Sequence, residues 1–548
     1  MKTYLFRTLL RTVGLLALAS LITCPNSISA QTVTCWGFGA NTFFTDPANW
    51  TNGVPGENDT AKFFVGVPFT VTMNVNATVN EFDHVMGDMT LNGGNQLKVT
   101  SPTKIDNELT VTGFETALIQ TNDLNIGEDE SGQLTIQDSS MLVVEDIFRV
   151  ARGNVGGEFS VQDSGTIADI GQLRIGSSGT GIMQVSNAAR VLTDRTRIGF
   201  NPGSIGNASI SGADSLLRTS TNMNLGHFGG TGTLNILSGT ATAGTEVNIG
   251  NALDSTGNVN MFGGVLESPE MFVGKEGDGD LDLRGGTGFI SSFVTIADGP
   301  DATGTANVIL SGRLETESLV VANEGSGMLG VSDGGVVDVD EGILVGANAG
   351  SIGSICIGTD GTLNCGFLTL GGNGAGDLII EENGEVDVDG LTFVAPNFDI
   401  AFQENGGSLT SGLGLQVAGR VFFSAGDNKI VGDVELTNDS IMRVGPTGGS
   451  IGRVEGSITN NGSRTIVPGG TTLIASGQVT GTSPFEGTGL IRLNGGLSPG
   501  NGVGSIEFEC DADFGAGAQI NIELGGTIAG SQYDQVRFND ISLSLIHI

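Results

Sequence analysis

Two short motifs recur through the middle of the chain with a common period of about 24 residues. One is a glycine followed by alternating apolar positions, as in Gly132-Gln-Leu-Thr-Ile and Gly232-Thr-Leu-Asn-Ile. The other is an apolar residue followed by Gly or Ala, and this Gly or Ala is termed the anchor. The anchors are Gly127, Ala151, Gly176, Gly199, Gly226, Gly250, Gly274, Ala297, Ala322, Gly346, Gly371 and Ala395. A fixed period of this size indicates a solenoid, in which each repeat buries its apolar face against its neighbours.

Within each repeat, apolar and polar residues alternate with a period of two, which is typical of short β-strands. Other repeat classes fit poorly. Leucine-rich repeats need a Leu/Asn spacing that is absent, calcium-binding rolls need more than the Gly-Asp-Gly-Asp at 277–280, and propeller blades are longer. The sequence therefore predicts an all-β fold, a parallel β-helix (β-solenoid) with about 24 residues per coil. Parallel crossovers are usually right-handed, so we expect a right-handed coil.

Residues 1–30 have the form of a secretory signal peptide. An apolar run at 13–22 is followed by small residues that end before Gln31. The cations that precede the run are Lys2, Arg7 and Arg11. The run is too short for a convincing membrane anchor, and the threonine before Cys24 fits a lipoprotein box poorly. We therefore expect an exported protein.

The chain is strongly acidic, with 60 Asp and Glu against 23 Lys and Arg. Removal of residues 1–30 takes away three cations and no acids, which leaves a net charge of 20 − 60 = −40. Such a charge repels nucleic acid and anionic membrane surfaces. It also keeps a strand-rich rod soluble. Divalent-cation binding by acidic turns such as Asp278/Asp280/Asp282 is the alternative, although no EF-hand spacing is present.

Composition and periodicity divide the chain into six parts. They are a signal peptide (1–30), an N-terminal β cap (31–123), regular β-helix repeats (124–395), an irregular β-helix continuation (396–485), a C-terminal β segment (486–540) and a suspect tail (541–548) that has the character of translated sequencing adapter. The cap holds Trp36 and Trp50, for which we expect packing in the core, with stacking on a sugar as the alternative. Cys356 and Cys365 fall within one coil, where they either pair or remain separate thiols.

Three features together carry a resemblance to a known family. They are the opening Trp36…Asp46-Pro-Ala-Asn-Trp50, the 24-residue Gly/β repeats, and the ending with Ser498-Pro-Gly-Asn and Tyr533-Asp-Gln-Val. The chain resembles large exported bacterial proteins with autotransporter-passenger-like repeats, many of which end in a PEP-CTERM sorting segment and others in an outer-membrane barrel. The resemblance implies a secreted or cell-surface location in a Gram-negative-type bacterium, a structural or adhesive role, and attachment through a C-terminal part that this sequence lacks.

The sequence contains no nucleophile elbow, P-loop, His-Glu-x-x-His or Cys-x-x-Cys motif. The histidines are His84, His227 and His547, none in a catalytic context. We therefore expect neither catalysis nor a cofactor or metal. The alternative is a β-helical polysaccharide lyase or glycosidase, because paired carboxylates could act on a glycosidic bond. With 60 acids, however, some pair always has a suitable spacing.

Arginines stand out against this acidic background at one phase of the repeat. Arg149, Arg174 and Arg197 each lie two residues before an anchor. Asparagines occupy the same phase in neighbouring repeats, so coils stacked in register would form an Asn125-Arg149-Arg174-Arg197-Asn224-Asn248 series, termed here the arginine ladder. Neutralisation of these charges by nearby Asp and Glu, such as Asp146, Asp169 or Asp194, is the interpretation that we favour. The alternative is a binding strip for an acidic extracellular polysaccharide, because arginine suits bidentate contact with carboxylate or sulfate.

Overall fold

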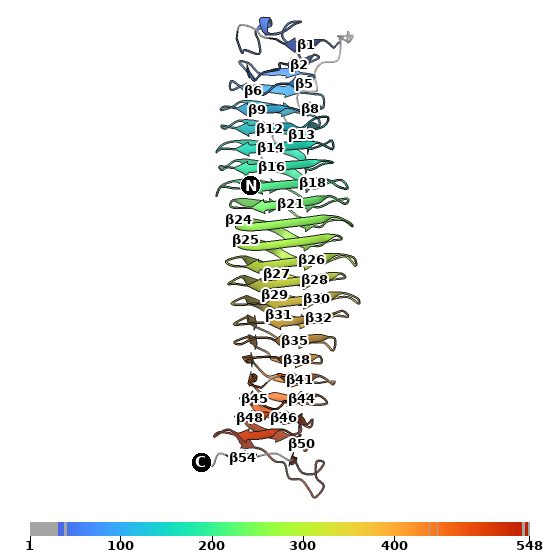
Figure 1. The fold of residues 1–548 in the computed structure, drawn as a ribbon, viewed down its shortest axis with the longest axis vertical. Helices are drawn as coiled ribbons and strands as arrows, with labels where there is room; N and C mark the ends of the chain where they lie inside the picture. Colours follow the sequence, from blue (N-terminus) through green and yellow to red (C-terminus); the bar gives the residue numbers. More distant parts are fainter. Residues whose placement is uncertain (1–30, 38–40, 438, 447, 540–542, 546–548) are drawn as a thin grey trace, which may run out of the picture.

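The computed structural model describes residues 31–37, 41–437, 439–446, 448–539 and 543–545. Within these residues the chain forms one stack of short parallel strands, a β-solenoid of about 20 turns about 24 residues apart. Figure 1 shows the coils along one long axis, with the N-terminal strands at one end and the C-terminal strands at the other. At a strand spacing of about 4.8 Å, 20 turns make a rod roughly 95 Å long. The predicted parallel β-helix is confirmed, and the predicted signal peptide lies outside the described residues.

Each coil supplies strand to three faces. In one coil, β12 (Gly132–Gln137) lies on the first face, and β13 (Met141–Val150) covers the second and third faces in turn. β13 rounds the corner between its two halves, where its register with β15 (Ile167–Ile175) shifts between Val144 and Ile147. The long strands of Figure 1 are therefore successive faces of one coil joined without a break.

The same plan frames the region discussed below. On the first face lie β14 (Gly156–Gln162), β16 (Thr180–Ser186), β18 (Ile205–Ile210) and β21 (Thr231–Ile236). On the second and third faces lie β17 (Arg190–Ile198), β19 (Leu216–Thr219), β20 (Met223–Leu225), β22 (Thr240–Ala243) and β23 (Glu246–Ile249). β24 (Thr256–Val273) and β25 (Asp278–Ile296) each run over all three faces.

The apolar residues of the repeat point inward and stack in register. Leu134 pairs with Phe159, and Phe159 pairs with Met183, all three fully buried. Burial of such a side chain stabilises the fold by about 1.5–3 kcal/mol, and a single coil cannot provide that burial alone. Between the apolar positions, polar residues form an outward row on the first face, namely Thr135, Ser160, Gln184, Ser209, Asn235 and Asn260.

The two glycine motifs meet at one corner of each coil, and each needs glycine for a different reason. The anchor Gly250 has a left-handed backbone, with φ +66°, and Ala297 adopts the same conformation with φ +57°. The motif glycine Gly257 has no such backbone, but a Cβ added to it would lie 2.2 Å from the backbone nitrogen of Gly250. The anchor turns the chain back against the start of the next strand, so one corner explains both motifs.

The segment predicted as an N-terminal cap, 31–123, contributes coils to the same stack. Its parallel pairing begins at β1 (Val33–Trp36), which pairs with β2 (Thr60–Phe64). Coils here are shorter than those of the regular repeats, since Lys104 on one coil pairs directly with Asn125 on the next. The period of the regular repeats therefore does not extend into this segment, although the architecture does.

The coils also continue beyond Ala395, with more variable lengths. Leu415 on one coil pairs directly with Val434 on the next, for example, which makes this coil shorter still. This variation accounts for the weaker periodicity of 396–485. Part of the predicted tail is described as β54 (Leu543–Leu545), which pairs in parallel with the preceding coil; the rest of the tail lies outside the described residues.

The cysteines of the two neighbouring strands β30 (Ile352–Ile357) and β31 (Thr362–Leu370) do not pair. Cys356 is half-buried and Cys365 faces the core, and both are free thiols. Of the two alternatives left open by the sequence, separate thiols is the one observed.

Candidate functional site

The arginine ladder forms on the third face as a continuous row. Asn125 on β11 (Leu124–Ile126) pairs with Arg149, and the row continues strand by strand through the predicted residues. The remaining pairs are Arg149 with Arg174, Arg174 with Arg197, Arg197 with Asn224, and Asn224 with Asn248. Neighbouring strands are about 4.8 Å apart, so three guanidinium-bearing positions lie within roughly 10 Å. The structure thus brings together the residues that the sequence placed in one phase. The row was expected to face outward along its whole length, but Asn125, Asn224 and Asn248 are buried, so this expectation is wrong for the asparagines.

Arg149, the first arginine of the ladder, is neutralised locally. Its Nη1 donates to Asp123 Oδ2 at 2.6 Å and to Asn125 Oδ1 at 3.2 Å. Asp123 precedes β11 and was not among the acids expected as partners. At this position the alternative of charge neutralisation therefore holds.

The other two ladder arginines have no acidic partner of this kind. Within the described residues neither Arg174 nor Arg197 forms an ion pair, and the buried Nε of each lacks a hydrogen-bond partner. Arg197 Nη1 donates only a long hydrogen bond, of 3.4 Å, to the neutral Gln172 Oε1. Both arginines lie against the ring of Phe200, with guanidinium carbons 4.2 Å and 5.4 Å from its centroid.

The electrostatic surroundings of these two arginines are unfavourable to their charge. Burial, together with the neighbouring guanidinium of Arg149, lowers the pKa of Arg174. Burial, followed by the charges of Arg174 and Arg195, lowers the pKa of Arg197 to about 10. Both side chains remain charged at neutral pH, and two desolvated cations side by side favour an anion between or above them.

His227 completes this end of the ladder. Its ring lies 5.4 Å from the ring of Phe200, and Asn251 Nδ2 donates to its Nδ1 at 2.6 Å. Burial, followed by the charges of Arg197 and Arg174, lowers the pKa of His227 to about 4. The ring is therefore neutral at physiological pH, and because Nδ1 accepts a hydrogen bond, Nε2 carries the hydrogen.

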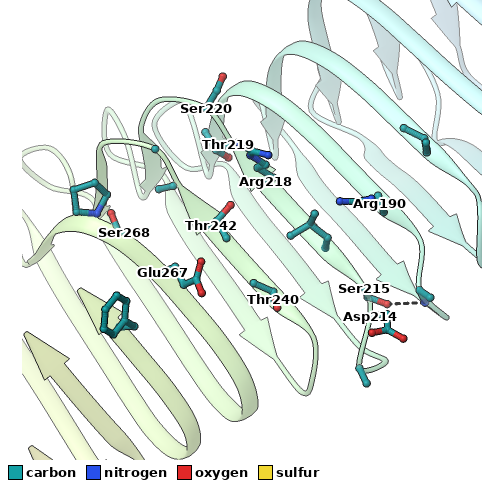
Figure 2. Close-up of a pocket in the computed structure, with 18 of the residues that line it drawn as sticks. Arg190, Asp214, Ser215, Arg218, Thr219, Ser220, Thr240, Thr242, Glu267 and Ser268 are labelled. Atoms are coloured by element: carbon teal, nitrogen blue, oxygen red, sulfur yellow. Dashed lines mark hydrogen bonds between the residues drawn. The ribbon is translucent and has the colours of Figure 1, made fainter. Parts of the chain in front are cut away.

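A shallow groove of about 1140 Å³ lies on the second face of the same coils, outside β15, β17, β19, β22, β24 and β25. Figure 2 shows Arg218, Thr242 and Glu267 following one another on the outer side of successive strands, with Arg190 in the adjacent row. The row beyond Glu267 continues to Phe289, whose side chain is exposed. Cationic, hydroxyl, carboxylate and aromatic groups therefore follow one another along the rod.

Longer turns wall the groove on both sides. The turn that holds Asp214 and Ser215 forms one wall, and Ser215 Oγ accepts a hydrogen bond from Ala188 N at 3.0 Å in the preceding coil. Ser220 and Gly244 lie at the opposite wall. The anchors Gly199 and Gly226 bound this coil and are 27 residues apart, the longest spacing in the repeat. Sequence reasoning missed the groove, and this long spacing was the signal that could have found it.

A smaller pocket of about 230 Å³ lies at the corner between the groove and the arginine ladder. Acidic residues dominate its lining, with Glu145, Asp146 and Asp194 beside Arg195. Arg195 Nε donates to Asn222 Oδ1 at 2.9 Å. This acidic corner separates the two cation-bearing faces.

The tryptophans predicted as either core or binding residues are core residues. Trp36 and Trp50 are 6% and 5% exposed, and their rings meet edge to face at 4.9 Å between centroids. Trp50 follows the short helix η1 (Pro47–Asn49), and its Nε1 donates to Phe44 O at 2.7 Å. Because packing covers the ring faces, neither ring is available to stack on a sugar.

The described residues contain no group of three or more His, Cys, Asp or Glu side chains arranged to hold a metal ion. The same holds for Asp278, Asp280 and Asp282, for which cation binding was the alternative; these residues were expected in a turn, but they form the start of β25. Nor does any helix within the described part of the chain have the length and apolar character needed to cross a membrane.

No family model matches the chain, and no solved structure matches it. The chain is similar to the uncharacterized lipoprotein YdeK of Escherichia coli K12, with 24% identity over 272 residues. The match covers 48% of this chain and 20% of that protein, so the chain spans only a small part of the relative's length.

Proposed function

We propose that this protein is an exported, surface-located rod with a structural and adhesive role, and that it binds acidic polysaccharide through the arginine ladder. The observation that carries the proposal is the pair Arg174 and Arg197. Both guanidiniums are half-buried, lack an ion pair within the described residues, and lie on Phe200 in a chain with a net charge of −37. Isolated cations in so acidic a protein recruit an external anion.

Location at the cell surface is supported by two observations. Residues 1–30 have signal-peptide character, and the similar Escherichia coli protein is named a lipoprotein. The resemblance to autotransporter-like exported proteins agrees with this location and with attachment to the outer membrane. Mass spectrometry of the mature N-terminus distinguishes cleavage before Gln31 from lipid attachment at Cys24.

A binding role is favoured over polysaccharide cleavage, because Arg174 and Arg197 form no ion pair within the described residues and are available to contact an anion. The rod offers long rows of polar side chains instead of a deep cleft. A binder retains the polymer and leaves its length unchanged, whereas a lyase or glycosidase generates new reducing ends. A reducing-end assay on the purified mature chain separates the two.

The binding test compares wild type with the Arg174→Gln/Arg197→Gln variant on immobilised polygalacturonate and dextran sulfate. Loss of two charge-assisted contacts should weaken retention by about tenfold or more. Arg492→Gln is the matched control, because it removes an arginine that is paired with Asp513 far along the rod. Unchanged retention in the ladder variant would overturn the assignment of the ladder.

A further inference from the structure

The groove on the second face contains two arginines that are separate from the arginine ladder. Arg190 and Arg218 are exposed, and neither forms an ion pair in the described part of the chain. They stand in adjacent rows on neighbouring strands, because Arg190 pairs with Leu216 and Arg218 is two residues further on. The half-buried Leu216 lies beside Arg190 on the neighbouring strand and two residues before Arg218 on its own strand, so it adds an apolar side chain to the groove next to both cationic residues.

Hydroxyl and aromatic groups extend the groove away from the arginines. Thr240 and Thr242 occupy the next coil, followed by Glu267 and then by Phe289, which is 47% exposed. An exposed ring at the end of a row of hydroxyl and carboxylate groups suits the apolar face and the hydroxyls of a sugar ring. The arginines mark where an anionic substituent would lie.

The shape of the groove selects an extended ligand. The strands beneath it belong to six successive coils, so it spans roughly 24 Å along the rod at about 4.8 Å per step. It is walled on both sides by turns and follows the axis of the rod. A linear chain lying lengthwise fits this shape, whereas a compact ligand would leave most of it empty.

From these observations we propose that the groove is a second binding site, in which a linear acidic polysaccharide lies along the rod with its carboxylate or sulfate groups on Arg190 and Arg218. The proposal rests on the proposed function for the class of polymer and adds the site.

The groove and the ladder act as independent sites. They lie on neighbouring faces of the same coils and are separated by the acidic corner that holds Glu145, Asp146 and Asp194. A polyanion is repelled from this corner, so one chain does not pass from the groove to the ladder. One rod therefore holds two polymer chains, one on each face.

The experiment measures the affinity of the full chain for polygalacturonate, dextran sulfate and neutral dextran by biolayer interferometry at fixed ionic strength. The groove variant is Arg190→Gln/Arg218→Gln, and the ladder variant Arg174→Gln/Arg197→Gln is compared with it. Glu267→Gln is the control within the groove, since it preserves shape and removes an anion. Arg190, Arg218 and Glu267 are exposed, so a thermal melt should show the groove variant and the control folded like wild type.

We expect the groove variant to bind acidic polymer about tenfold more weakly, and the combination with the ladder variant to weaken binding further. Glu267→Gln should bind at least as well as wild type. Preference for polygalacturonate identifies carboxylate as the partner of the arginines, and preference for dextran sulfate identifies sulfate. Equal binding of neutral dextran overturns the acidic class.

The outcomes separate the two proposals. If wild type binds acidic polymer and only the ladder variant loses affinity, the groove proposal is wrong and the proposed function stands. If only the groove variant loses affinity, the groove is the site and the ladder assignment is wrong. If wild type binds neither acidic polymer, both proposals fail.

Discussion

Gly181 faces the anchor of the preceding turn so closely that a Cβ on Gly181 would lie 2.1 Å from the backbone nitrogen of Gly176. The space between Gly181 and Gly176 therefore accommodates a hydrogen on the Cα of Gly181 but not a side chain. The contact is between two backbone segments, and neither can move without disturbing the stack above and below it. The same opposition recurs along the rod, for instance between Gly279 and Gly274 at 2.0 Å.

Gly181→Ala should therefore destabilise the fold by roughly 1–3 kcal/mol, since the added methyl forces a backbone shift inside a packed corner. Chemical denaturation followed by circular dichroism measures the loss. Gly517→Ala is the control, because a Cβ at Gly517 meets nothing within 4 Å and its φ is not left-handed. Equal stability of the two variants would contradict the steric account of the repeat.

His84 should make the N-terminal coils sensitive to acid. Burial lowers the pKa of His84 below 6.5, against the opposing effects of a hydrogen bond to Gly87 O and of the charges of Asp88 and Asp83. Its lowered pKa means that the unfolded chain binds more protons, so this contribution to stability is present above about pH 6.5 and is lost as the pH falls toward the folded-state pKa. Thermal melts between about pH 7 and 5 should show a fall in stability that is smaller in His84→Gln.

His227 reports directly on the two ladder arginines. Its pKa of about 4 is lowered first by burial and then by Arg197 and Arg174. Arg197→Gln should therefore raise the pKa of His227 toward, but not to, the ordinary value of 6.5. NMR titration of the imidazole carbon protons measures it. A midpoint unchanged in the variant would show that the guanidinium does not face the ring.

Asp123→Asn should strengthen the ladder as an anion site. Asp123 neutralises Arg149, so its removal frees a third arginine beside Arg174. We expect the affinity for dextran sulfate to rise roughly two- to fivefold, with a steeper dependence on salt. Asp427→Asn, which frees Arg453 at a remote coil, is the control for a general effect of lost negative charge.

The cysteines should react in a fixed order. Burial raises the pKa of Cys365 and of Cys510 to about 12, which leaves almost no thiolate near neutral pH. Cys35 and Cys356 are half-buried and should be alkylated by iodoacetamide first, with Cys365 and Cys510 labelled only after denaturation. Peptide mass spectrometry under non-reducing conditions should find no link between Cys356 and Cys365.

The arginine ladder was predictable because register in a solenoid follows from the spacing of the anchors. Residues at one offset from successive anchors must lie on one row, and Arg149, Arg174 and Arg197 do so. Their partners were not predictable from that rule. Asp123 and Phe200 lie at the turns, where chain direction and side-chain packing are set by each coil separately.

The difference between regularly spaced strand residues and individually shaped turns also explains why the coils at the ends of the rod and the groove were not predicted. The shorter coils near Lys104 and Leu415 continue the same parallel stack, but the period of the regular repeats does not reveal them. Variation in turn length, which obscures the pattern in a sequence, also makes the walls of the groove around Ser215 and Ser220. Regularity therefore identifies the scaffold, and departures from it locate the surface features.

The parallel pairing of successive coils also determines how the rod responds to mechanical force. The hydrogen bonds between coils run along the long axis, so tension between the two ends is carried by all coil boundaries in series, and the boundaries break one after another. Each coil that detaches exchanges about 4.8 Å of rod for roughly 80 Å of extended chain. Under load the molecule would therefore lengthen in steps and dissipate energy at each step, as an extensible tether does. The coils that are still folded would meanwhile keep their bound polymer.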